Sequence, residues 1–226
     1  MSELLAARIR VSAILGLFAF AIVLAAGVPA GVFTAVRRGS RWDLAGLGVS
    51  TALAALPSFV LSFLLLLVFS IWLGWTDVRP TGFGESIGSL RAGVLPAVAL
   101  AAPSMALLAR MTRASLLDAL DADYVRTARA KGLTERSVVW RHALRNALVP
   151  VLTLSGPLLA NLIVGSIIVE SIFGLPGIGT LFVTSIGLRD YGVIMGVTLF
   201  YALIVMAMNL AVDLLYPVLD PRVRLA

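Results

Sequence analysis

The main pattern along the chain is a series of five long runs without Asp, Glu, Lys or Arg, separated by shorter polar segments. The runs cover residues 13–36, 44–75, 92–109, 146–169 and 191–212. A helix needs about 20 apolar residues to cross the hydrocarbon core of a bilayer, so each run can form a transmembrane helix. The pattern predicts an all-α fold, a polytopic membrane bundle of about five helices in a single transmembrane domain, 1–226.

The second run, 44–75, is too long for one straight span but shorter than the roughly 40 residues that two crossings require. We expect one crossing preceded by a segment at the membrane interface, with a bend at Pro57. Prolines also occur inside the third and fourth runs, and lipid cannot satisfy the backbone groups that they leave unpaired. These helices are therefore expected to be kinked and packed against each other.

Composition supports a membrane protein, because 60% of the residues are hydrophobic and only 13% are charged. The chain has no cysteine, which excludes disulfides, thiolate metal sites and a cysteine nucleophile. The net charge of +6 could indicate nucleic-acid binding. The basic residues lie between the apolar runs, however, where membrane orientation explains them better, so no nucleic-acid partner is expected.

The distribution of basic residues predicts the orientation. When the runs are threaded alternately, thirteen basic residues fall on one side: Arg37, Arg38, Arg41, Arg110, Arg113, Arg126, Arg129, Lys131, Arg136, Arg141, Arg145, Arg222 and Arg224. Five fall on the other: Arg8, Arg10, Arg79, Arg91 and Arg189. The positive-inside rule then places the loop 110–145 and the C-terminus in the cytoplasm. The N-terminus would lie outside, where its two arginines, Arg8 and Arg10, are difficult to translocate. Either an upstream helix is missing from this sequence or the chain is a natural five-helix form.

The loop 110–145 has the composition of helices, with Ala, Leu and Arg dominant. Apolar residues recur in it at spacings of three and four and predict a helical stripe: Leu116, Leu117, Leu120, Tyr124, Val125 and Ala128. Gly132 is expected to end the helix, and Thr134 to cap the next one. A helix, turn and helix are therefore predicted on the cytoplasmic face.

Such a loop could simply rest on lipid headgroups, but its sequence favours a specific role. DYVRTARAKGL at 123–133 and RHALRNALVP at 141–150 resemble the cytoplasmic signature of ABC importer permeases. The version is that of the dipeptide, oligopeptide and nickel permease family. The correspondence covers two small residues, a glycine and two downstream positions: Thr127, Ala128, Gly132, His142 and Leu144.

The sequence departs from the general signature at two positions. Arg126 replaces a glutamate and Arg145 a proline, and both changes are typical of the peptide branch. Further similarity lies in FGLPGIG at 173–179, RDY at 189–191, DLLY at 213–216 and DPRVR at 220–224. The usual N-terminal helix of the family and the extracytoplasmic segment after it are absent from this sequence.

The resemblance implies a transport subunit rather than an enzyme. It implies three kinds of protein partner besides the lipid bilayer, which would be the inner (plasma) membrane of a bacterium or archaeon. They are a second homologous permease, two cytoplasmic ABC ATPases and an extracytoplasmic solute-binding protein. ATP and Mg would bind to the ATPases, and this chain would bind no cofactor or metal. The residues expected to couple it to an ATPase are Asp123, Tyr124, Arg126, Thr127, Ala128, Arg129, Ala130, Lys131, Gly132, Arg141, His142 and Arg145. The solute, whether dipeptide, oligopeptide, nickel chelate or opine, stays open.

Three polar residues near the fourth run are candidates for the solute path or outer gate: Asn161, Ser166 and Glu170. The alternative roles are hydrogen bonds between helices for Asn161 and Ser166, and an interfacial carboxylate for Glu170. The segment 174–180 is expected to be a turn, because it contains Pro176 and lacks the lysine of a phosphate loop.

The sequence fits two other classes of membrane protein less well. An ion-coupled secondary transporter usually keeps ionisable residues inside the membrane, and these runs contain none. An intramembrane protease needs catalytic side chains at membrane depth, whereas the single histidine, His142, lies in the polar loop.

Overall fold

A computed structural model describes residues 2–76, 83, 91–164 and 167–219, and this part of the chain is helical with no strand. The first half contains α1 (Ser2–Ile22), the π-helical segment η1 (Val23–Gly27), α2 (Val28–Val36), α3 (Arg41–Ala55), α4 (Ser58–Leu65) and the π-helical segment η2 (Leu66–Trp72). The second half contains α5 (Val94–Asp121), α6 (Asp123–Ala130), α7 (Glu135–Ser137), the π-helical segment η4 (Val138–Ala143), α8 (Leu144–Val164), α9 (Ile167–Phe173), α10 (Ile178–Leu188) and α11 (Tyr191–Leu219). The predicted all-α membrane fold is confirmed.

Within the described residues, four continuous helical stretches are long and apolar enough to cross a membrane. They are Ala6–Val36, Arg91–Asp121, Glu135–Val164 and Tyr191–Ala211. Two bent pairs raise the number to six if each is one span: Arg41–Ala55 with Ser58–Trp72, and Ile167–Phe173 with Ile178–Leu188. The expected five spans fall within this range.

The bend predicted at Pro57 is confirmed. The helices on either side of it meet at 101°. Leu56 adopts an extended conformation (ψ 119°), as residues before proline prefer, and Pro57 then precedes the first turn of α4. The steric restriction that Pro57 places on Leu56 therefore divides the second apolar run into two helices.

The boundaries of the polar loop differ from the prediction of 110–145. The helix of the third run does not end at residue 109 but continues as α5 to Asp121. At the other end, η4 and α8 already form a helix before residue 146. A charged residue ends an apolar run but does not break a helix. The length of a run therefore indicates how much of the helix lies in the membrane, and the helix itself can be longer.

Helix α5 is the centre of the bundle and packs against α1, α2, α3, α4 and α8. Its contact with α2 is close, because a Cβ atom on Gly31 would overlap the Ala109 carbonyl and the Thr112 side chain. Small residues allow such approaches between membrane helices, where the lipid supplies no hydrophobic driving force. The large side chains of the main core, such as Leu15, Leu108 and Phe173, are fully enclosed.

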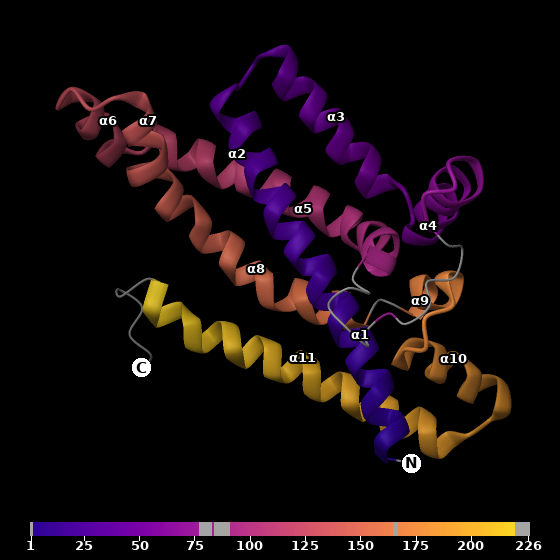
Figure 1. The fold of residues 1–226 in the computed structure, drawn as a ribbon. Coiled ribbons are helices and arrows are strands. Elements are labelled where there is room, and N and C mark those ends of the chain that lie inside the picture. Colours follow the sequence, from indigo (N-terminus) through magenta and orange to yellow (C-terminus); the bar gives the residue numbers. More distant parts are fainter. Residues whose placement is uncertain (1, 77–82, 84–90, 165–166, 220–226) are drawn as a thin grey trace.

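The ribbon shows how the remaining elements lie around this core (Figure 1). α6 and α7 stand at one end of the hairpin formed by α5 and α8. α9 and α10 lie at the opposite end of the molecule, near the N-terminus. The length of the bundle thus separates the polar α6 and α7 from the α9 and α10 pair.

Candidate functional site

Helix α6 forms a short projection at the tip of the α5 and α8 hairpin. The chain leaves α5 at Ala122, which is extended (ψ 151°), and Asp123 starts α6 with a negative charge at its positive end. One face of α6 is anchored, because Val125 and Ala128 are buried in a cluster with Leu116 and Val138. The predicted apolar stripe therefore exists, but it is divided between two helices.

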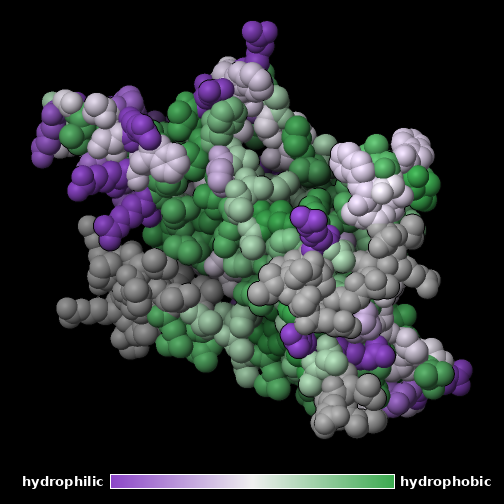
Figure 2. Space-filling model, in the orientation of Figure 1, coloured by the Kyte–Doolittle hydropathy of each residue, from purple (hydrophilic) through white to green (hydrophobic). Residues whose placement is uncertain are grey.

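The opposite face of α6 is open. All the candidate residues on it are exposed: Asp123, Tyr124, Arg126, Thr127, Arg129, Ala130 and Lys131. Hydrophilic residues gather at this corner in the space-filling view (Figure 2). Its ion pairs are solvent-exposed, Arg126 with Asp123 at 3.5 Å and Arg129 with Glu135 at 2.8 Å, and such pairs contribute little stability. The basic groups are thus available to an acidic partner.

The turn after α6 has the predicted geometry. Gly132 has a φ of +78°, its N–H donates to the Arg129 carbonyl at 2.9 Å, and Leu133 N–H donates to the Ala128 carbonyl at 3.4 Å. A Cβ atom on Gly132 would meet nothing within 4 Å, so backbone conformation rather than space favours glycine here. Thr134 then caps α7 by accepting from Ser137 N–H at 3.4 Å.

The second part of the predicted site lies next to the first. η4 packs against α6, and Ala143 of η4 belongs to the same buried cluster as Val125 and Ala128. Arg141 and Arg145 are exposed, whereas His142 is partly buried. The two sequence segments that carry the resemblance therefore form one surface.

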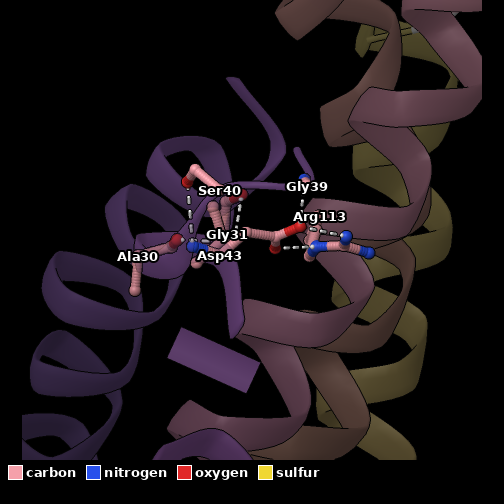
Figure 3. A network of polar contacts seen from close by, with 7 residues as sticks. Ala30, Gly31, Gly39, Ser40, Asp43 and Arg113 are labelled. Atoms are coloured by element: carbon pink, nitrogen blue, oxygen red, sulfur yellow. Dashed lines mark hydrogen bonds and ion pairs between the residues drawn. The ribbon is translucent and has the colours of Figure 1, made fainter. Parts of the chain in front are cut away.

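A buried ion pair near this end of the bundle was missed by the sequence analysis. Arg113 on α5 donates from Nε to Asp43 Oδ1 and from Nη2 to Asp43 Oδ2, both at 2.8 Å (Figure 3). Asp43 also accepts from Gly39 N–H at 2.9 Å, and its own N–H donates to the capping Ser40 at 3.3 Å. The pair fastens the turn between α2 and α3 to α5.

A sequence signal for half of this contact was available. Asp43 is the only acidic residue between Glu3 and Asp77, and it follows Ser40 by three residues, as in a helix N-terminal capping motif. The basic partner, 70 residues away, could not be chosen from several nearby arginines.

At the opposite end of the molecule, Glu170 is fully buried. Its carboxylate accepts from Ser12 Oγ at 2.6 Å, from Gly179 N–H at 2.9 Å and from Thr180 N–H at 3.4 Å. Ser12 Oγ in turn accepts from Ile178 N–H at 2.9 Å. The acid and the serine thus satisfy the free N–H groups at the start of α10, whose partial positive charge favours a carboxylate.

The description of Glu170 as an interfacial carboxylate is therefore wrong. Its surroundings leave no access, since a Cβ atom on Gly177 or Gly179 would overlap the carboxylate. In this conformation it cannot touch a binding protein directly, and its role at an outer gate stays a prediction. The predicted turn before α10 is confirmed, with Gly174 at φ +67°.

The other two candidates of the solute path stay predictions. Asn161 is exposed on α8, and Ser166 lies outside the described residues. Within the described part of the chain, no three His, Asp or Glu side chains gather as metal ligands would.

The chain was compared with known families. The family described as "Binding-protein-dependent transport system inner membrane component" matches residues 27–225. The chain belongs to this family. It is accordingly a transport subunit of an ATP-binding-cassette (ABC) importer and not a catalytic enzyme, as the resemblance in the sequence implied.

Curated relatives agree with this assignment. The oligopeptide transport system permease protein OppB of Salmonella typhimurium is 42% identical over 224 residues, which are 99% of this chain and 72% of the relative. A putative peptide transport system permease protein of Brucella abortus is 44% identical over 226 residues, with 72% of its length covered. The ion-coupled secondary transporter has no support among these relatives.

Two solved structures are similar to this chain in fold although their sequence identity to it is low. A chain of the inward-facing MetNI methionine ABC transporter superposes with a TM-score of 0.80 at 18% identity, over 97% of this chain and 98% of that one. A chain of an amino acid ABC transporter gives 0.71 at 19% identity, over 95% and 94%. The family member therefore has the fold of ABC importer transmembrane subunits.

Proposed function

We propose that this permease forms, with a second homologous permease, the membrane path for peptides or related small solutes. The names of the relatives favour peptides, and the resemblance of the sequence also allows nickel chelates. A separate extracytoplasmic protein would deliver the solute. Two cytoplasmic ATPases would bind ATP and Mg and drive transport.

The observation that carries the coupling part of this proposal is the construction of α6. One face of the helix is buried against the bundle. The other face carries small and basic side chains and is exposed at the tip of the molecule. Thr127 and Ala130 leave room for close approach, while Arg126, Arg129 and Lys131 can pair with acidic groups of an ATPase. We infer that α6 docks on that subunit on the cytoplasmic side and moves with it during the ATPase cycle.

Gly132→Val tests this coupling. Valine at a φ of +78° is strained by about 1–3 kcal/mol, so we expect the turn to shift and α6 to be displaced. The amount of protein in the membrane should stay normal. ATP hydrolysis by the assembled transporter should continue, while ATP-driven peptide uptake into proteoliposomes falls by at least ten-fold.

Gly48→Val is the matched control. Gly48 is exposed within α3, a Cβ atom there meets nothing within 4 Å, and its φ is not positive. Uptake by this control should be close to that of the natural sequence. Normal uptake by the Gly132→Val transporter would show that α6 does not transmit the ATPase cycle.

A further inference from the structure

A groove of ≈ 340 Å³ runs between α2, α3 and α5. It is lined largely by small side chains on the facing helices, including Ala26, Ala30, Ala45, Ala106 and Ala109. Ala106 and Ala109 are buried in α5, whereas Ala26, Ala30 and Ala45 are exposed on the other two walls. The helices meet near Gly46 and Thr34, and the alanines leave the space beside that contact unfilled.

The groove opens beside aromatic residues of the kind found at membrane interfaces. Phe33 and Trp42 line it and pack edge to face with ring centroids 6.5 Å apart. The Arg37 guanidinium lies 4.3 Å from the centre of the Phe33 ring. Trp and Arg beside an apolar surface are typical of the level of lipid headgroups.

Two arginines of α5 line the groove, and they differ in their partners. Arg113 is neutralised by its two hydrogen bonds to Asp43. Arg110, one helical turn closer to the membrane centre, has no ion pair or hydrogen bond within the described part of the chain and is only partly exposed. Arg110 is the first charged residue after the apolar run 92–109, so it lies where that run reaches the headgroup level, and a partly buried cation there favours an anionic partner.

We propose that the groove binds one anionic phospholipid. An acyl chain occupies the space between the alanines, and the phosphate pairs with the guanidinium of Arg110. Arginine binds phosphate with strong, charge-assisted hydrogen bonds, and basic pockets between membrane helices suit lipid headgroups.

The chemistry of the groove favours a lipid over a helix of another protein. Nearly its whole lining is apolar, and the unpaired charge is confined to Arg110. A lipid carries its charge at one end of apolar chains and matches this arrangement directly. A helix of another protein would need an acidic side chain opposite Arg110 on a face that is otherwise apolar.

Native mass spectrometry of the full chain in detergent tests the proposal. The probes are phosphatidylglycerol and phosphatidylcholine with identical acyl chains, added in increasing amounts. We expect one phosphatidylglycerol molecule to be retained well beyond the statistical background, and phosphatidylcholine to be retained no better than background. Arg110→Gln should weaken phosphatidylglycerol retention by roughly five-fold, and Arg110→Lys should restore most of it.

A steric pair of variants tests the position of the acyl chain. Ala30→Phe fills the groove from its exposed wall without entering the core, and should abolish selective retention. Ala25→Phe, an equally exposed alanine outside the groove, should leave it intact. Arg136→Gln removes a charge from exposed α7 and should also have no effect.

Three results would overturn the proposal. Equal retention of both lipids would show that the groove does not recognise an anion. Retention unchanged in both Arg110→Gln and Ala30→Phe would place the bound lipid elsewhere. A second protein chain, released by Ala30→Phe but not by Ala25→Phe, would show that a protein occupies the groove.

Discussion

A single carboxylate, Asp43, links two parts of the membrane bundle. It joins the backbone of the turn after α2 to a guanidinium of α5, and its side chain is only 4% exposed. Its loss would leave Arg113, whose side chain is only 21% exposed, without its anionic partner. Removing one member of a buried ion pair lowers the free energy of unfolding by more than the intact pair contributes to it, because the remaining charge has no partner.

Asp43→Ala should therefore lower the free energy of unfolding by about 2–3 kcal/mol, because Arg113 loses two charge-assisted hydrogen bonds but stays partly solvated. Thermal unfolding of the purified protein in detergent measures the change. The double variant Asp43→Leu with Arg113→Met should recover much of the loss, because no buried charge is left unpaired.

Asp121→Ala is the control for this variant. The Arg38–Asp121 pair is 3.5 Å long with side chains 62% and 72% exposed, and its loss should cost below about 1 kcal/mol. Equal losses of unfolding free energy in Asp43→Ala and Asp121→Ala would show that the Asp43–Arg113 pair stabilises the protein no more than an exposed pair does.

Residue roles were predictable from sequence where they depend on local geometry. The turn at Gly132 and the cap at Thr134 involve neighbours within a few positions, and both were predicted correctly. The side-chain partners of Asp43 and Glu170, which are Arg113 and Ser12, lie 70 and 158 positions away. Such contacts depend on how the helices pack, which hydrophobic patterning alone does not determine.

The start of α10 is held by polar contacts from two other helices. It follows a 93° bend after α9, and Glu170 of α9 and Ser12 of α1 bind its first N–H groups. Because lipid offers no replacement for a lost acceptor, these contacts determine whether the first turn of α10 is stable.

Glu170→Ala should accelerate hydrogen exchange across the first turn of α10, at Ile178, Gly179 and Thr180. Ser12→Ala should have a smaller effect that is largest at Ile178. Peptides of α5 should exchange at the natural rate in both variants. Exchange is measured on the intact protein by mass spectrometry.

Ser171→Ala is the control, since its hydroxyl is exposed and bonds only to the Ile167 carbonyl within its own helix. If exchange in α10 were unchanged in Glu170→Ala, the carboxylate would not hold this helix.

Element boundaries were predictable where a steric rule applies and less so elsewhere. Pro57 determines its own bend, so that break was expected. The end of α5 was placed too early because the first charge, Arg110, was taken as the end of the span, whereas the helix continues for three more turns. The division into α5 and α6 at Ala122 follows from packing of the short helix on Leu116 and Val138, which no local pattern announces.

For the whole molecule, the sequence predicted the class of fold and the family, because both depend on long apolar runs and one dense motif. The side on which each polar end lies is a further prediction from the basic residues. The structure places α6 and α10 at opposite ends of the bundle, as alternating spans require.

Single-cysteine labelling can test that orientation, and the natural chain has no cysteine to replace. Ala130→Cys in α6 should react with a membrane-impermeant maleimide only in inverted vesicles. Arg189→Cys, between α10 and α11, should react in intact spheroplasts. Labelling of both positions from the same side would contradict the predicted topology.

The length of α5 has a mechanical consequence. Its 28 residues form a rod of about 42 Å that carries α6 beyond one end and touches most other helices along its length. If α5 tilts by about 10° about one of its ends, the other end moves by roughly 7 Å, which is more than the roughly 5.4 Å pitch of one helical turn. A modest rotation imposed at the tip of the hairpin would thus be amplified into rearranged side-chain contacts on the far side of the membrane.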